Sequence, residues 1–188
     1  MQSSTIVILI AVAVVVILAI WLVWQRRRTE SLRHRFGPEY ERAVREHGTP
    51  RKAEAALDAR EKRVERLHIV SLRPAERDQF AASWKAAQAR FVDDPKAAIH
   101  DADQLVADVM KERGYPMGDF EQRAADISVD HPRVVENYRK AHAIALRSER
   151  ENVTTEDLRT AMVHYRTLFE DLLETPVTTT EQHTGART

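Results

Sequence analysis

Residues 115–142 hold the side chains of this sequence that are best suited to chemistry. Acidic residues lie there together with tyrosines, arginines and two histidines, and histidine changes its charge near neutral pH. His131 stands next to Asp130 at an expected helix start, and His142 falls on the inward side of the helix that carries Tyr138. This composition predicts a pocket formed by Asp126, Asp130, His131, Tyr138, Arg139 and His142.

Simpler roles for the same residues stay open. Asp130 can cap a helix, His131 can fill a turn, and His142 can be a core histidine with a hydrogen-bond partner. No nucleophile with a paired base accompanies them, and Gly114 and Gly118 do not match a phosphate-binding loop. We therefore expect no catalytic residue and no enzyme activity.

A metal centre or a bound cofactor is not expected either. A di-iron bundle needs a Glu-x-x-His pair on each of two helices, and only Glu65 and His68 have that spacing. Asp101 and Asp103 lie close to His100, but they point across a broad arc of a helix and are assigned to capping and solvation. The chain has no cysteine, which excludes disulfides, thiol nucleophiles and zinc sites of the cysteine type.

Helices are the elements that must position these residues. Proline is tolerated at a first helical position and glycine just after a last one, and both divide this chain at helical intervals. Strong apolar faces repeat every three to four residues in the segments 74–92, 94–113, 130–146 and 154–172. No segment alternates with a period of two. The sequence predicts an all-α protein, with about four core helices in a bundle over residues 74–174.

Two other segments flank the expected bundle. Residues 25–73 are basic and have sparse apolar positions, which is typical of a juxtamembrane helical stalk or an outer helix. Residues 175–188 hold Thr, Gln, Glu, His and Gly with almost nothing to bury. We expect this last segment to be a disordered tail.

An unbroken apolar run of nineteen residues occupies residues 6–24, after an N-terminal stub of residues 1–5. At about 1.5 Å per residue, a helix of that length covers roughly 28 Å, close to the roughly 30 Å core of a bilayer. A cleaved secretion signal needs a basic segment before the run, whereas here the arginines follow it. The run therefore predicts one transmembrane helix.

The residues at the end of the run predict its orientation. Trp21 and Trp24 suit the headgroup layer, and Arg26, Arg27 and Arg28 belong on the cytoplasmic side. We expect a single-pass protein of the plasma (inner) membrane, with its N-terminus outside and its bundle in the cytoplasm. The alternative places the domain outside the cell and requires the arginines to fail as a topology signal.

Charge is distributed unevenly along a chain whose formal net charge is zero. Residues 25–77 have 15 Lys or Arg against 9 Asp or Glu, and residues 78–188 have 14 against 20. Anionic lipid headgroups attract such basic segments, so we expect a lipid partner near Arg26 to Arg28. A nucleic-acid surface needs concentrated basic residues with aromatic stacking partners, and here the basic residues alternate with Glu. No nucleic-acid partner is expected.

Several short segments carry a resemblance. They are RFGPEY at residues 35–40, ARFVDDP at 89–95, GYP at 114–116, DFE at 119–121 and DHPRVVENYR at 130–139. Together they resemble an uncharacterised family of bacterial proteins with one membrane span and a helical cytoplasmic domain. The resemblance covers residues 35–173 and implies a topology but no activity.

These observations lead to a function class and one alternative. We expect a membrane-anchored cytoplasmic helical scaffold or protein-interaction module, which binds a protein partner. The alternative is a ligand-binding or enzymatic bundle with its site around His131 and His142. A pocket that both histidines face would favour the alternative, and a filled core would exclude it.

Overall fold

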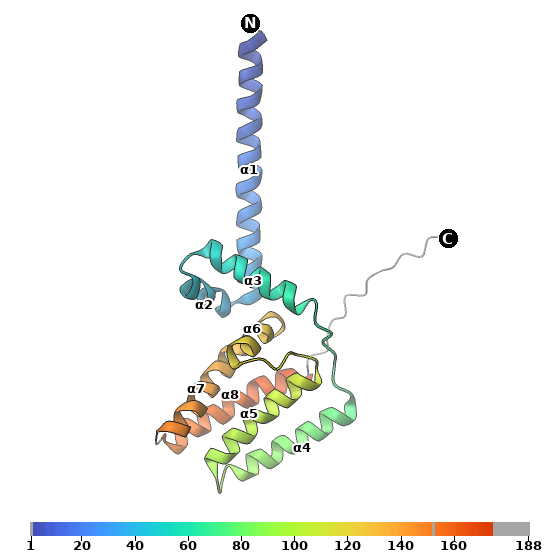
Figure 1. Cartoon of the computed structure of the whole chain (residues 1–188), viewed down its shortest axis with the longest axis vertical. Coiled ribbons are helices and arrows are strands. Elements are labelled where there is room, and N and C mark those ends of the chain that lie inside the picture. The colour runs from blue at the N-terminus through green and yellow to red at the C-terminus, as the bar shows by residue number, and fades with distance from the viewer. Residues whose placement is uncertain (1, 152, 175–188) are drawn as a thin grey trace, which may run out of the picture. The chain divides into compact units, whose positions relative to one another are not determined.

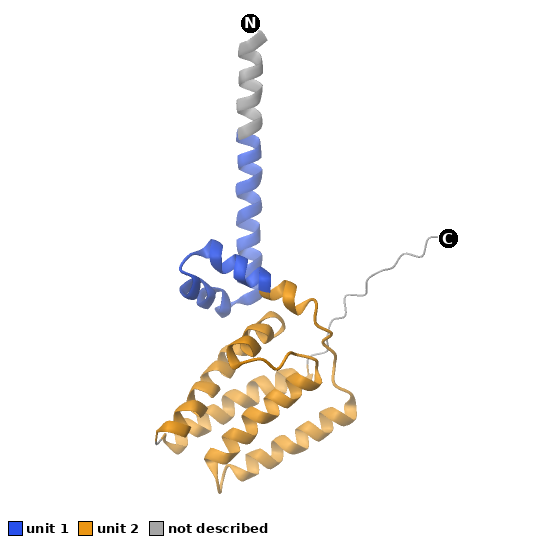
Figure 2. Ribbon diagram, viewed as in Figure 1, with its two compact units in different colours: residues 1–59 blue, residues 60–188 orange. Residues whose placement is uncertain are grey.

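A computed structural model describes residues 2–151 and 153–174 of the chain, with side chains from Val15 onward. These residues form eight helices and no strand, which confirms the all-α prediction. The predicted tail, residues 175–188, lies outside the described residues. The chain divides into two compact units, residues 1–59 and residues 60–188 (Figure 2).

The first unit contains α1 (Gln2–Phe36), α2 (Pro38–His47) and most of α3 (Pro50–Val64). Gly37 joins α1 to α2 with a φ of 48°, a value that glycine adopts at little cost. A small apolar core holds the C-terminal part of α1 to the two short helices, and it consists of Leu32, Phe36, Tyr40, Ala43, Ala53 and Leu57. The sparse apolar positions of α3 are thus buried.

The second unit is a helical bundle, as predicted (Figure 1). Its four long helices are α4 (Pro74–Arg90), α5 (Pro95–Glu112), α7 (Val135–Arg150) and α8 (Thr155–Glu174). Helix α5 packs against α4 and α8, and α8 also packs against α7. The shorter α6 (Phe120–Asp130) packs against α7.

Local sequence signals explain where the bundle helices begin. Pro74 and Pro95 occupy the first positions of α4 and α5. Asp94 caps α5 by accepting a 3.1 Å hydrogen bond from the backbone N–H of Ala97. At α8, the hydroxyl of Thr154 accepts from the N–H of Asp157, and the Asp157 carboxylate accepts from the N–H of Thr154, both at 3.1 Å.

The core of the bundle lies between α4, α5, α7 and α8. Trp84 is 5% exposed and stacks on Phe169 of α8, with ring centroids 4.6 Å apart. The predicted inner face of α8 is buried, including Leu158, Tyr165 and Leu172. The helical repeat of apolar residues therefore identified the core-facing side of α8.

The connection between α3 and α4 is hydrogen-bonded to the end of α5. The backbone N–H of Val70 donates a 2.9 Å hydrogen bond to the carbonyl of Arg113. Gly114 has a φ of 93°, and a Cβ there would come within 2.4 Å of the His68 carbonyl oxygen. Gly114 is therefore required by both its conformation and its surroundings. The neighbouring Arg113 is buried, and its guanidinium donates a 2.7 Å hydrogen bond to the carbonyl of Leu172.

The prediction of a transmembrane helix needs correction. Among the residues whose side chains are described, no helix is both long enough and apolar enough to cross a bilayer. The described part of the apolar run, residues 15–24, ends at Gln25 and the arginines. Ten residues of helix measure about 15 Å, half of a bilayer core of roughly 30 Å. The predicted plasma-membrane location, with one crossing and a cytoplasmic bundle, is contradicted by this finding.

Candidate functional site

Four helices of the bundle contribute to a group of polar side chains that we call the polar cluster. Its members are Asp103 of α5, Arg123 of α6, Tyr138 and His142 of α7, and Tyr165 of α8. The Tyr165 hydroxyl donates a 2.8 Å hydrogen bond to Asp103 Oδ1. His142 Nδ1 lies 3.7 Å from the same carboxylate oxygen, an ion-pair distance when the ring is protonated.

Helix α6 covers the other side of the cluster. Arg123 Nε donates a 3.3 Å hydrogen bond to the Tyr138 hydroxyl, and one of its terminal amino groups donates to the Gly118 carbonyl at 2.9 Å. The Phe120 ring stacks on the His142 ring with centroids 3.7 Å apart and an interplanar angle of 8°. The imidazole is therefore held between an aromatic ring and a carboxylate.

Burial and neighbouring charges fix the protonation states in the cluster. Burial raises the pKa of the Asp103 carboxyl, but the neighbouring His142 and the Tyr165 hydroxyl outweigh it and bring that pKa below its usual value. Burial, together with the Asp103 charge, raises the pKa of Tyr165, and burial also raises the pKa of Tyr138. At neutral pH the carboxyl is ionised and both phenols keep their protons.

The polar cluster can hold helices together. Both tyrosines are buried, and their hydroxyls already take part in hydrogen bonds. No serine, threonine or lysine is among its members. Its contacts join α5 to α8 and α6 to α7. We interpret the polar cluster as a fixed internal network.

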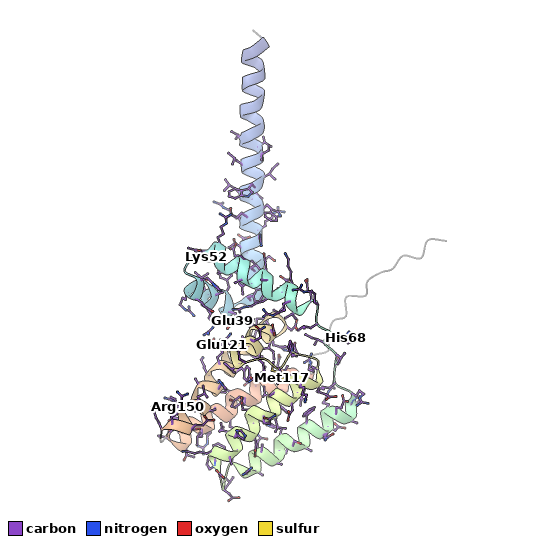
Figure 3. The ribbon with its side chains drawn as sticks, in the orientation of Figure 1. Glu39, Lys52, His68, Met117, Glu121 and Arg150 are labelled. Atoms are coloured by element: carbon purple, nitrogen blue, oxygen red, sulfur yellow. The ribbon has the colours of Figure 1, made fainter. Side chains whose placement is uncertain are left out.

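The structure places the sequence-predicted pocket residues in several separate contacts. Tyr138 and His142 belong to the polar cluster. Asp126 is fully buried and accepts a 2.7 Å hydrogen bond from Arg63 Nε, with further donation from Gln122. Arg139 donates a 2.6 Å hydrogen bond to Glu121 of α6, which is labelled in Figure 3.

His131 and Asp130 lie at the end of α6. His131 is buried, and its Nδ1 contacts the Asp171 carboxylate of α8. Its Nε2 has no hydrogen-bond partner among the described residues. Asp130 accepts a 2.8 Å hydrogen bond from the Tyr115 hydroxyl. The two histidines therefore have different carboxylate neighbours, Asp171 and Asp103.

Sequence reasoning missed three members of the cluster. Asp103 was assigned to capping and solvation, although it follows the buried Ala102 and accepts from Tyr165. Tyr165 lies in the segment 154–172, which the sequence predicts only as a core helix, and the predicted pocket does not include Arg123. A sequence signal for such residues is a polar side chain on a helix face that is otherwise apolar. Among the described residues, no group of three or more His, Cys, Asp or Glu side chains is arranged to hold a metal ion.

A second candidate site is the described apolar part of α1, residues 15–24, which we call the apolar stretch. Its large side chains are between 49% and 64% exposed, and Ala19 is exposed as well. Trp21 and Trp24 lie at its C-terminal end, where the Arg28 guanidinium sits 5.6 Å from the centroid of the Trp24 ring. Arg26 and Arg27 are exposed, and Arg28 forms an ion pair with Asp58 of α3.

Comparisons with known proteins assign no role to the polar cluster or to the apolar stretch. The resemblance to a bacterial membrane-protein family stays a prediction. No family model, no curated protein and no solved structure matches this chain.

Proposed function

We propose that this chain is a non-catalytic helical interaction module, in which the bundle is the scaffold and the apolar stretch is the docking element. The exposure of the stretch carries the proposal. Soluble monomers rarely leave a contiguous apolar surface open, and such surfaces mark interaction sites. Here ten consecutive apolar residues are exposed on one helix.

The bundle supports a scaffold role because several of its polar side chains are paired with other helices or segments of the same unit. Asp103, Asp126 and His131 each have a partner on another helix or segment of the same unit. Such long-range polar pairs favour one fixed packing of the helices. A bundle with one fixed packing is suited to present a constant surface to a partner.

Proximity labelling in intact cells tests the docking role of the stretch. A labelling enzyme fused to the C-terminus is compared in the wild-type chain and in a double variant, Leu18→Gln with Leu22→Gln. Both leucines are more than half exposed, so the change makes the stretch polar without opening a core. The control replaces two exposed apolar residues of the bundle, Val92→Gln with Val163→Gln.

The proposal expects the double variant to lose neighbours that the wild-type chain and the control variant both label. If the wild-type chain and the stretch variant label the same neighbours, the stretch is not the docking element and the proposal fails.

A further inference from the structure

We propose that the apolar stretch and the arginines after it dock on an anionic lipid surface. This inference rests on the proposed docking role of the stretch and names the chemistry of its partner. It concerns association with a lipid surface and requires no helix that crosses a bilayer.

The distribution of apolar side chains favours lipid over a protein groove. A helix that binds in a protein groove presents one apolar stripe, with residues spaced three and four apart. Successive residues of a helix point about 100° apart, so the ten consecutive apolar residues of the stretch cover every side. All of them are exposed. Lipid chains at a bilayer surface can cover whichever side of such a helix faces them, whereas a protein groove matches only one stripe.

The charges at the end of the stretch favour an anionic surface. Arg26 and Arg27 are exposed directly after Trp24 and Gln25. Tryptophan prefers the headgroup layer, which would place the arginines at the level of lipid phosphates. Each basic residue near an anionic surface contributes about 1 kcal/mol, which is about fivefold in affinity.

A hollow lies where the stretch meets the charged part of the first unit. It has a volume of about 230 Å³, and its lining includes Trp21, Trp24, Arg28 and Arg51. Glu54 also lines the hollow, but its carboxylate accepts hydrogen bonds from Thr29 at 2.7 Å and Tyr40 at 3.0 Å. Arg28 is already paired with Asp58, whereas Arg51 is exposed. Guanidinium groups bind phosphate through charge-assisted hydrogen bonds, so Arg51 at this hollow suits a lipid phosphate.

Vesicle flotation tests the inference with the full chain. The protein is synthesised in a cell-free reaction that contains preformed vesicles of phosphatidylcholine alone or mixed with phosphatidylglycerol. The vesicles are then floated through a density gradient, which leaves aggregated protein at the bottom. The wild-type chain should float with the mixed vesicles much more than with the neutral ones, and added salt should reduce the difference.

Two variants separate the contributions of charge and apolar surface. Arg26→Gln with Arg27→Gln should weaken binding to the mixed vesicles by about 25-fold, since each arginine contributes about fivefold. A matched control removes two exposed arginines of the bundle, Arg77→Gln with Arg133→Gln, and should float like the wild-type chain. Leu18→Gln with Leu22→Gln should lose binding to both kinds of vesicle.

Other outcomes overturn the inference. Equal flotation with both vesicle types, or none with either, excludes an anionic lipid partner. If flotation fails while the leucine variant still loses neighbours in proximity labelling, the stretch docks on a protein, and the proposed function stands without this inference. If the leucine variant changes neither measurement, both proposals fail.

Discussion

The polar cluster and the apolar stretch place side chains in opposite environments. In the bundle, the carboxylate of Asp103 is largely enclosed and accepts from Tyr165, and Tyr138 is fully buried beneath Arg123. On α1, Trp21 and Trp24 are more than half exposed. Polar groups are thus inside and apolar groups outside, and each arrangement costs free energy unless something compensates it.

The two regions differ in where that compensation comes from. Within the cluster the hydrogen bonds supply it, since donors and acceptors of four helices meet there. The apolar stretch has no comparable cover within the described part of its unit. The cluster therefore contributes to stability, and we propose that the stretch contributes to binding. Paired substitutions can separate these two roles.

The largest difference should appear between two tryptophans. Trp84→Ala removes a ring that is 5% exposed and stacked on Phe169, and deletion of a buried aromatic costs about 3–5 kcal/mol. Trp24→Ala removes a ring that is 60% exposed, and its effect should stay within about 0.5 kcal/mol. Urea unfolding followed by circular dichroism measures both. Equal losses in the two variants would contradict the assignment of the stretch to binding.

Glycine substitutions give the next largest difference. Gly114→Ala should cost about 2 kcal/mol or more, because φ is positive there and the new Cβ would meet the His68 carbonyl at 2.4 Å. Gly48→Ala, with a φ of 76° and open space around it, should cost about 1 kcal/mol. The free energies of unfolding of the two variants test whether Gly114→Ala has the larger loss. A smaller loss for Gly114→Ala would show that the connection near His68 moves freely.

Local parts of this fold could be predicted from the sequence. Pro38, Pro50, Pro74 and Pro95 each begin a helix, because the preference of proline for that position depends only on its own ring and missing N–H. The segments 74–92 and 154–172, whose apolar repeats predict core helices, contain Trp84 and Phe169, and both are buried. Neither signal requires knowledge of distant contacts.

The pairings in the candidate site could not be predicted in the same way. Asp103 and Tyr165 are 62 residues apart, and His131 and Asp171 are 40 apart. Which helix faces which is set by the packing of whole helices, and the sequence of one helix does not encode it. The predicted pocket grouped residues that are near in sequence, whereas the cluster joins Tyr138 and His142 to α5, α6 and α8.

Removing one hydroxyl from the polar cluster should have a moderate effect. Tyr165→Phe keeps the buried ring but takes away the donor to Asp103. The Asp103 side chain is 28% exposed, so the loss should lie at the low end of the about 1–3 kcal/mol that an unsatisfied buried partner costs. The matched change Tyr115→Phe removes the donor to Asp130, whose carboxylate is exposed to water. Urea unfolding should show the smaller loss for Tyr115→Phe. A larger loss for Tyr115→Phe would mean that the hydrogen bond between Tyr165 and Asp103 contributes no more to stability than a surface contact.

The same cluster should make stability depend on acid. The pKa of Asp103 is lowered in the folded chain, so its ionised form stabilises the fold at pH values above the unfolded pKa, about 3.9. That contribution is lost as the pH falls through the lower folded pKa. The wild-type chain should therefore lose its advantage over an Asp103→Asn variant below about pH 4. Unfolding midpoints measured from neutral pH downward test this, and a difference that stays constant would contradict it.

The smallest effect on folding is expected for the variant that should abolish docking. Leu18→Gln with Leu22→Gln changes exposed side chains, and glutamine is nearly as good a helix former as leucine. The free energy of unfolding should therefore change by less than about 0.5 kcal/mol. Circular dichroism in urea, with Val92→Gln and Val163→Gln as the control, measures this change. A loss of several kcal/mol would mean that the stretch is covered in the folded chain, and its exposure could then no longer support a docking role.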